Sequence, residues 1–289
     1  MNPARWPAPA KLNLFLHVLG RRADGYHEIQ SVFQLIDRCD SLAIEARPDG
    51  LICRLEGPET VPDSADLCLR AARRLQSEAG VGQGASIRLD KRIPIEGGLG
   101  GGSSDAATTL VALNEIWGLQ WDTGRLCSLG AGLGADIPLF IQGQSAWGEG
   151  IGERLTPVEL PRRHFAVIYP GIGVPTGEVF QAPELTRNSA KTTIRGFLKA
   201  GGRNDCEAVV SRRFPEVARA LAWLAARGNA RLTGTGSCIF AGFADRAMAE
   251  AALEGLPPEW SGFVARGLDR SPLQERLAAE RGARTGGQD

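Results

Sequence analysis

The sequence predicts an α+β protein, in which strands and helices do not alternate regularly along the chain. Residues 10–19 show the alternation of a strand, with Leu12, Leu14, Leu16 and Val18 on one face and Lys11, Asn13, Phe15 and His17 on the other. Apolar residues after position 105 follow the spacing of a helix, with Ala106, Leu110, Leu113 and Trp117 on one stripe and Gly118 at its end. A glycine-rich loop at 97–105 leads directly into that helix.

The other elements are predicted in chain order from apolar runs, helical spacing and turn residues. The segment at 20–27 is rich in turn residues, and Arg231–Phe240 contains a glycine turn beside an apolar strand. A charged connector near Gly152–Pro161 predicts a boundary between a domain at 1–155 and another at 156–289. Strands are expected at Ser31–Leu35, Ser41–Ala46, Ala85–Leu89, Ile137–Ile141 and Phe165–Tyr169, and helices at 64–79, Leu126–Asp136, 190–200 and Pro215–Arg227.

Composition narrows the class of protein. The formal net charge of zero argues against a nucleic-acid partner held by bulk electrostatics, and no apolar run is long enough for a membrane span. The six cysteines are scattered and there are only three histidines, so we expect reduced thiols and no structural metal. The N-terminus does not resemble a signal peptide. We therefore expect a cytoplasmic protein. Composition does not fix the oligomeric state or the partner; we expect a monomer or a weak homodimer that acts on a small molecule.

The glycine loop is the strongest functional signal in the chain. It reads Gly-Gly-Leu-Gly-Gly-Gly-Ser-Ser-Asp from Gly97, and Ser103, Ser104 and Asp105 are natural helix N-cap residues. A glycine loop before a helix directs free N–H groups and the positive end of the helix dipole at one point, which suits a phosphate. The alternative is a flexible linker, which needs neither caps nor a helix behind it. The loop matches neither a Walker A motif nor a dinucleotide fingerprint.

Phosphoryl transfer also needs a group that orients or deprotonates the acceptor and a positive charge near it. Lys11 and Asp136 are candidates for these roles. The alternatives are an edge-strand lysine that discourages aggregation and an aspartate in a turn or helix cap. His27 follows Asp-Gly-Tyr in a turn and could present an imidazole beside the Tyr26 ring. The alternative is a surface turn with Tyr26 packed on the core. The Thr233–Ser237 loop is either a second wall of the phosphate site or a tight turn.

Several segments, in their order and spacing, resemble the GHMP kinases, and the resemblance extends from about Pro9 to Leu273. No single motif is specific, but the set is. The segments are Pro-Ala-Lys-Leu-Asn-Leu-Phe-Leu (9–16), Arg-Ala-Asp-Gly-Tyr-His-Glu-Ile (22–29), Gly-Leu-Gly-Gly-Gly-Ser-Ser-Asp-Ala-Ala (98–107), Leu-Gly-Ala-Asp-Ile-Pro (133–138) and Leu-Thr-Gly-Thr-Gly-Ser (232–237).

The resemblance implies a two-domain fold, with an N-terminal α+β domain that holds an ATP loop and a C-terminal ferredoxin-like domain. The Lys-Leu-Asn-Leu and Asp-Gly-Tyr-His-Glu segments are similar to the branch of the family that acts in the non-mevalonate route to isoprenoid precursors. That branch transfers the γ-phosphoryl group of ATP to the 2-hydroxyl of 4-diphosphocytidyl-2-C-methyl-D-erythritol. The implied cofactors are ATP and Mg²⁺, with the metal held mainly by the phosphates.

The same resemblance assigns roles to individual residues. Asp136 becomes the base or orienter of the hydroxyl, and Lys11 its charge partner. A cytosine ring could then stack between Tyr26 and Phe180 while His27 bonds its polar edge. The implied ATP contacts are Asp66, Lys91, Pro94, Ile95, Glu96, Gly97, Gly98, Leu99, Gly100, Gly101, Gly102, Ser103 and Ser104, and the implied substrate contacts are Asn13, Tyr26, His27, Thr176 and Phe180.

Two positions depart from the family pattern. Glu96 stands where a small residue usually precedes the glycine core, and its carboxylate would repel a triphosphate unless it pairs or points outward. Asp66 replaces an asparagine near the adenine, so a hydrogen-bond donor is lost. Two alternatives to the main hypothesis remain: another small-molecule GHMP kinase, acting for example on homoserine or mevalonate, and a non-catalytic nucleotide or metabolite sensor.

Overall fold

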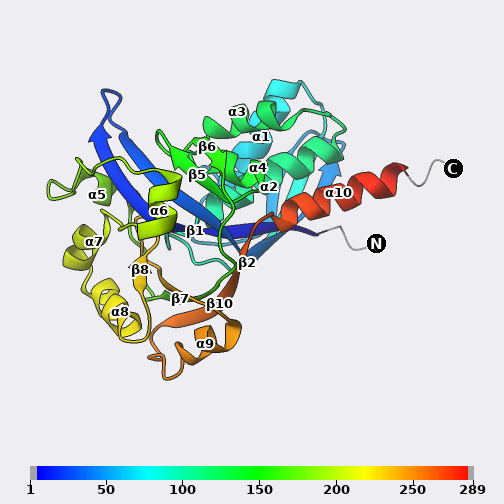
Figure 1. Ribbon diagram of the computed structural model, residues 1–289. Coiled ribbons are helices and arrows are strands. Elements are labelled where there is room, and N and C mark those ends of the chain that lie inside the picture. The colour runs from blue at the N-terminus through cyan, green and yellow to red at the C-terminus, as the bar shows by residue number, and fades with distance from the viewer. Residues whose placement is uncertain (1–4, 286–289) are drawn as a thin grey trace.

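The computed structural model describes residues 5–285, and its central feature is a long antiparallel pair of strands (Figure 1). Strand β1, Arg5–Arg21, runs beside β2, His27–Arg47. The turn-rich segment expected after residue 20 forms the tip of this hairpin. Residues 10–19 lie in a strand as predicted, but both of its faces are covered, because Phe15 is as fully buried as Leu12.

The two strands expected over 31–35 and 41–46 are parts of the single strand β2, so the predicted break between them is wrong. The polar residues that suggested the break do not end the pairing. Residues 37–38 have no partner on β1, where the register shifts between Pro9 and Ala10. A bulge of this kind carries extra residues without ending the strand.

Within residues 5–285 ten strands form one sheet, and the pairing of β2 with β10 joins its two halves. The order along the sheet is β3-β4-β2-β10-β7-β9-β8, while β1 pairs with β2 and the hairpin β5–β6 also pairs with β2. The two halves meet where β10 pairs with β2 at Gly267–Ile36 and Leu268–Leu35. The further strands are β3 (Ile52–Glu56), β4 (Gly84–Asp90), β5 (Ala146–Glu149), β6 (Arg154–Pro157), β7 (His164–Tyr169), β8 (Ala230–Leu232), β9 (Ile239–Phe243) and β10 (Ser261–Leu268).

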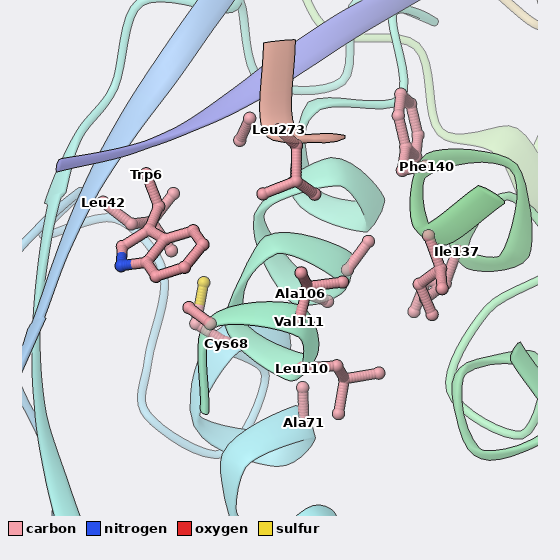
Figure 2. Packing of buried hydrophobic residues seen from close by; sticks show 14 of the residues in the cluster. Trp6, Leu42, Cys68, Ala71, Ala106, Leu110, Val111, Ile137, Phe140 and Leu273 are labelled. Carbon is pink, nitrogen blue, oxygen red and sulfur yellow. The ribbon is translucent and has the colours of Figure 1, made fainter. Parts of the chain in front are cut away.

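In the first half, the helices pack around α2, which the glycine loop precedes. Figure 2 shows α2 between Trp6 on one side and Ile137 and Phe140 on the other, with Leu273 nearby. The sequence predicted one apolar stripe on α2, but the helix is buried on nearly all sides because other helices and β1 and β2 surround it. The helices are α1 (Leu67–Ala79), α2 (Gly101–Ile116), α3 (Thr123–Ala131), α4 (Ile137–Gln142) and α10 (Pro272–Thr285).

The strand predicted at Ile137–Ile141 is wrong, since these residues form helix α4. A run of five apolar residues has no periodicity that separates a buried strand from a buried helix. The flanking residues carry the information instead. Pro138 lies in the first turn, where its missing N–H costs nothing, and Gly143 ends the helix in the left-handed conformation (φ 69°).

The second half has the ferredoxin-like arrangement expected for the C-terminal domain. Its four strands occur in the order β10-β7-β9-β8, with α8 between β7 and β8 and α9 between β9 and β10. Helix α8 carries Pro215 at its start as predicted, and the helix expected over 190–200 begins at Ile194. The helices are α5 (Thr176–Gln181), α6 (Ile194–Ala200), α7 (Glu207–Arg213), α8 (Pro215–Ala225) and α9 (Arg246–Ala251).

Helices and strands are mixed without strict alternation, so the α+β prediction is confirmed. The domain boundary at residue 155 stays a prediction; the position falls within β6, and α10 returns to the first half, where Leu273 is fully buried in the core around α2. Between residues 5 and 285, no helix has the length and apolar character required to cross a lipid bilayer.

Candidate active site

The candidate site is a cleft of about 1080 Å³ that both halves of the chain line. Apart from Ser104, every residue that the sequence singled out for catalysis, ATP binding or substrate binding contributes to its wall. Ser104 is fully buried, and its hydroxyl has no hydrogen-bond partner. The structure therefore gathers residues from the two ends of the chain, such as Lys11 and Phe180, around one cavity.

The glycine loop forms one wall of the cleft, and two of its glycines are sterically required. Gly98 and Gly100 have φ values of 74° and 71°, which side chains disfavour. A Cβ at Gly98 would lie 2.3 Å from the Thr233 carbonyl oxygen, and one at Gly100 would lie 2.9 Å from the Phe140 ring. The glycines therefore let the loop pack closely against Thr233 and Phe140. A glycine-rich turn that leads into a helix N-terminus is the arrangement of a phosphate cradle.

The predicted capping of this helix by Ser103, Ser104 or Asp105 is wrong. The N-cap is Gly100, which makes no side-chain capping bond, and the three polar residues lie within the first turns of α2. Glycine at this position leaves the N–H groups at the start of the helix without a side-chain acceptor. The absence of a side-chain cap favours the phosphate-site interpretation over the linker, because a ligand can accept these hydrogen bonds.

The Thr233–Ser237 loop forms a second wall, as one of its two interpretations predicted. The Cys238 amide donates to the Gly97 carbonyl at 3.0 Å, and the Ser237 amide donates to the Glu96 carbonyl at 3.3 Å. The amide of Asn13 donates to the Thr233 hydroxyl at 2.9 Å. These bonds join the glycine loop and β1 to the ferredoxin-like half, so they fix the two walls of the cleft relative to each other.

Lys11 and Asp136 meet at the centre of the cleft, with Nζ and Oδ2 separated by 3.6 Å. Lys11 is only 4% exposed, which excludes its interpretation as a solvated edge-strand lysine. Its ammonium donates to Asn13 Oδ1 at 2.5 Å and to the Gly98 carbonyl at 3.0 Å. Asp136 occupies the N-cap position of α4 but makes no capping hydrogen bond, so its carboxylate is free to face Lys11.

Lys91 lies behind the glycine loop between two buried carboxylates. Its ammonium donates to Asp105 Oδ2 at 2.9 Å and to Asp40, which is fully buried. Burial opposes its charge, but Asp105 and Asp40 together outweigh burial and raise the pKa of Lys91. Burial also raises the pKa of Asp105, an effect that Lys91 opposes. The sequence analysis missed both carboxylates, because Asp40 is far away in the chain and Asp105 resembled a helix cap.

Asp66, the first departure from the family pattern, is fully occupied by protein donors. Its Oδ1 accepts from the amides of Cys68 and Leu69 and so caps α1. Its Oδ2 accepts from Arg54 at 2.7 Å. The carboxylate is thus compensated by an arginine that the sequence analysis did not connect with it, and an adenine contact at Asp66 stays a prediction.

Glu96, the second departure, has a left-handed backbone (φ 54°) and an exposed side chain. Its carboxylate lies against Gly173 on the opposite half, where an added Cβ would fall 2.5 Å from Oε2. The carboxylate therefore lies beside the second half of the molecule rather than over the helix N-terminus.

The other end of the cleft carries aromatic and polar side chains near the tip of the β1–β2 hairpin. Tyr26 is 60% exposed, whereas His27 is buried. The His27 ring stacks on Phe180, with centroids 5.2 Å apart and planes at 27°. Thr176 shares a hydrogen bond of 2.9 Å with Thr235. The alternative of a surface turn with Tyr26 packed on the core is therefore wrong for both residues, since Tyr26 is exposed and His27 is buried.

Arg187 is a residue at this end that the sequence analysis missed. Its Nε donates to His27 Nε2 at 3.0 Å, and burial, followed by the charges of Arg187 and Arg21, lowers the pKa of His27. The residue lies in an irregular segment after α5. No spacing or motif in the sequence identifies it.

Comparison with known proteins agrees with this geometry. The family models for the GHMP kinases N terminal domain and the GHMP kinases C terminal match residues 66–144 and 184–261. The 4-diphosphocytidyl-2-C-methyl-D-erythritol kinase of Alkalilimnicola ehrlichii is 54% identical over 275 residues, covering 95% of this chain and 94% of the relative. The protein of the same name from Halorhodospira halophila is 53% identical over 284 residues, covering 97% and 98%.

Solved structures with a similar fold include members of the same family. A crystal structure of 4-(cytidine 5'-diphospho)-2C-methyl-D-erythritol kinase superposes with a TM-score of 0.80 at 34% identity, covering 91% of this chain and 99% of that one. A homoserine kinase from Cytophaga hutchinsonii has a TM-score of 0.71 at 17% identity, covering 94% and 96%. At that identity the homoserine kinase supports the fold alone.

The site thus combines a backbone cradle suited to phosphate, a Lys11–Asp136 pair suited to activating a hydroxyl, and an aromatic end suited to a flat ring. All three line one cleft.

Proposed function

The chain belongs to the GHMP kinase family, and from this premise we propose that it transfers the γ-phosphoryl group of ATP to the 2-hydroxyl of 4-diphosphocytidyl-2-C-methyl-D-erythritol. This reaction is a step of the non-mevalonate route to isoprenoid precursors. The proposal is supported by relatives of that name that are more than half identical over nearly the whole chain. It is also supported by the contents of the cleft, which match each need of phosphoryl transfer to an alcohol.

The observation that carries the chemistry is the Lys11–Asp136 pair. An acceptor hydroxyl placed between the two would meet a carboxylate that accepts its proton and an ammonium that stabilises charge on the oxygen. Two further hydrogen bonds, to Asn13 and to the Gly98 carbonyl, hold the ammonium in place. The pair is therefore preorganised, with its lysine anchored to the same loop that would hold the phosphates.

The glycine loop suits a nucleoside triphosphate, since its left-handed turns at Gly98 and Gly100 lead into the start of α2, where the first amides have no side-chain cap. When bound, ATP supplies the phosphoryl group. We assign it to Asp66, Lys91, Ser104 and residues 94–103, with the loop amides directed at the phosphates. Within the described residues there is no cluster of three or more His, Cys, Asp or Glu side chains able to hold a metal. The proposed Mg²⁺ therefore relies on phosphate oxygens for most of its ligands.

The substrate end is assigned to Asn13, Tyr26, His27, Thr176 and Phe180. Aromatic faces suit a cytosine ring, and the histidine edge suits its polar atoms. We further propose that the enzyme acts in the cytoplasm as a monomer or a weak homodimer, with a domain boundary near residue 155.

Phosphorus NMR of the reaction products tests the proposal. The protein is incubated with ATP, Mg²⁺ and 4-diphosphocytidyl-2-C-methyl-D-erythritol, and in parallel with homoserine or mevalonate as the acceptor. A new phosphate-ester signal from the cytidylated alcohol alone is expected. Transfer to homoserine or mevalonate instead would favour another kinase of the family, while ATP binding without transfer to any acceptor would favour the sensor alternative.

A further inference from the structure

We propose that Arg187 holds His27 in one neutral tautomer, with its proton on Nδ1, and that this donor selects cytosine over uracil in the substrate. The inference deepens the proposed function and rests on it, because it concerns how the same site recognises the cytosine base of the substrate. Arg187 lies in the segment after α5, and His27 is the first residue of β2. The two side chains meet at 3.0 Å between Nε and Nε2.

Every hydrogen of the Arg187 guanidinium is already directed at an acceptor. A guanidinium has five N–H donors, no acceptor and a charge that it keeps in proteins. Nε uses its one donor on His27, and four carbonyl oxygens take the rest. These carbonyls belong to Pro183 (3.4 Å) and Leu185 (3.1 Å) on Nη1, and to Phe180 (3.0 Å) and Ala182 (2.7 Å) on Nη2.

The consequence is that His27 Nε2 must accept a hydrogen bond. The doubly protonated ring and the Nε2–H tautomer would both place an N–H group against the Nε–H of Arg187. Only the neutral ring with its proton on Nδ1 has a lone pair at Nε2. Burial and the Arg187 and Arg21 charges act in the same direction, since they lower the pKa of His27 and favour the neutral ring.

The Nδ1–H group is available to a ligand. No hydrogen bond from any residue in the described part of the chain reaches Nδ1, and His27 lines the cleft. The ring cannot turn freely, because Phe180 stacks on its face while Arg187 binds its edge. Arg187 also binds the Phe180 carbonyl, so one side chain positions both of these rings.

A fixed donor distinguishes the two pyrimidines. N3 of cytosine is an acceptor, whereas N3 of uracil carries a hydrogen. A donor at Nδ1 is therefore complementary to cytosine and opposes uracil, where two donors would face each other and remain unsatisfied. Sites that bury a hydrogen-bonding group reject mismatched partners strongly for this reason. Arg187 is thus a positioning residue, acting through His27 rather than on the substrate.

The first test is the tautomer of His27 in the ligand-free protein. With ¹⁵N-labelled histidine the protein has only three imidazole rings, and the His27 signals are assigned by their loss in His27→Asn. We expect the Nδ1–H form, although an unconstrained histidine favours the proton on Nε2. In Arg187→Met, the population should shift toward Nε2–H. A wild-type spectrum with the proton on Nε2 would overturn the inference without any variant.

The second test is the ratio of kcat/KM for the cytidine substrate to that for its uridine analogue. We expect Arg187→Met to reduce this ratio by at least about tenfold, the loss of one discriminating hydrogen bond, with a larger change in KM than in kcat for the cytidine substrate. The matched control is Arg213→Gln at the end of α7, which removes an ion pair with Glu184, a residue of the same segment as Arg187, and should leave the ratio unchanged.

The outcomes separate this inference from the proposed function. An equal loss on both substrates, with the ratio unchanged, would make Arg187 a structural residue and overturn the inference while the kinase activity stands. A wild type that phosphorylates both pyrimidine substrates equally would do the same. If neither substrate reacts, the proposed function fails, and the NMR result still decides whether Arg187 fixes the tautomer.

Discussion

The two ends of the cleft are built in different ways. The phosphate end is made of backbone, with Gly98 packed against Thr233 and with Lys91 buried behind the loop. The base end is made of side chains at the tip of a hairpin, where Tyr26 is 60% exposed and Arg187 orients His27. A backbone cradle accepts phosphate from any nucleotide, whereas side-chain donors distinguish one base from another. The comparison implies that stability and chemistry depend on the first end and specificity on the second.

The largest effect should come from Asp136→Asn, which lies where the two ends meet. An amide cannot accept the hydroxyl proton as a carboxylate does, so we expect kcat to fall by about a thousandfold or more with the fold retained. Single-turnover kinetics with circular dichroism measure both. Asp245→Asn is the matched control, because asparagine also caps helices well at that N-cap position. Activity of Asp136→Asn within tenfold of wild type would remove Asp136 from the mechanism.

Lys91→Met tests whether the phosphate end depends on its buried charges. Without the lysine, Asp105 and Asp40 are left buried together, and we expect the free energy of unfolding to fall by about 3–5 kcal/mol. Its neighbour Arg92, whose side chain is 58% exposed, serves as the control, and Arg92→Met should cost less than about 1 kcal/mol. Urea denaturation measures both variants.

The pH dependence of the Lys91→Met defect has a definite sign. Burial already raises the pKa of Asp105, and removal of the lysine takes away the charge that opposes this rise. The folded variant should therefore bind a proton more readily than the unfolded chain, so its deficit shrinks as the pH falls. A deficit that grows toward acidic pH would contradict the assigned ion pairing.

Alanine substitutions at two glycines of the loop test whether glycine is sterically required at Gly98 or only preferred there. A Cβ at Gly98 meets the Thr233 carbonyl at 2.3 Å in a left-handed backbone, so Gly98→Ala should cost about 2–4 kcal/mol. At Gly102, within α2, the nearest atom would be 3.5 Å away. Gly102→Ala should therefore be neutral or stabilising by up to about 1 kcal/mol. Equal melting temperatures for the two variants would show that the close approach at Gly98 is unimportant.

The smallest effect belongs to the base end and concerns pH. The pKa of His27 is below its usual 6.5, because of burial first and then the Arg187 charge. As the pH falls through 6.5, the unfolded chain binds a proton at this residue before the folded protein does. Wild-type stability should thus decline relative to His27→Asn over this range. His17, whose pKa is also lowered, contributes equally to both proteins, and a flat difference between their stabilities would contradict the lowered pKa.

The sequence predicted the glycine loop and the helix that follows it because these signals are local, but it assigned the wrong helix cap and missed Asp40 as a partner of Lys91. Glycines, their order and the following helix all occur between 97 and 118, and the strand that carries Lys11 shows its own alternation. Predictions of secondary structure were wrong where an element is buried on all sides, because its apolar residues then show no periodicity. Helix α4 looked like a strand because all its first five residues are apolar, and β2 looked broken because a bulge at 37–38 places polar residues within it.

The base end was less predictable because its parts are far apart in the sequence. Arg187 reaches His27 across 160 positions. The same kind of separation hid one contact of the phosphate end, where Asp40 reaches Lys91 across 51 positions. A buried ion pair or a donor fixed by a distant side chain leaves no spacing to detect. The residues assigned to substrate came from the resemblance to a family, and their geometry became visible only in the folded chain.

The central claim is that the base end determines which acceptor the phosphate end phosphorylates. The most direct measurement is single-turnover phosphoryl transfer from ATP to 4-diphosphocytidyl-2-C-methyl-D-erythritol, compared with the same phosphorylated sugar alcohol that lacks the cytidine nucleotide. We expect rapid transfer to the first and at least about a hundredfold slower transfer to the second, since the contacts at His27 and Phe180 would be lost. Equal rates on the two acceptors would contradict it.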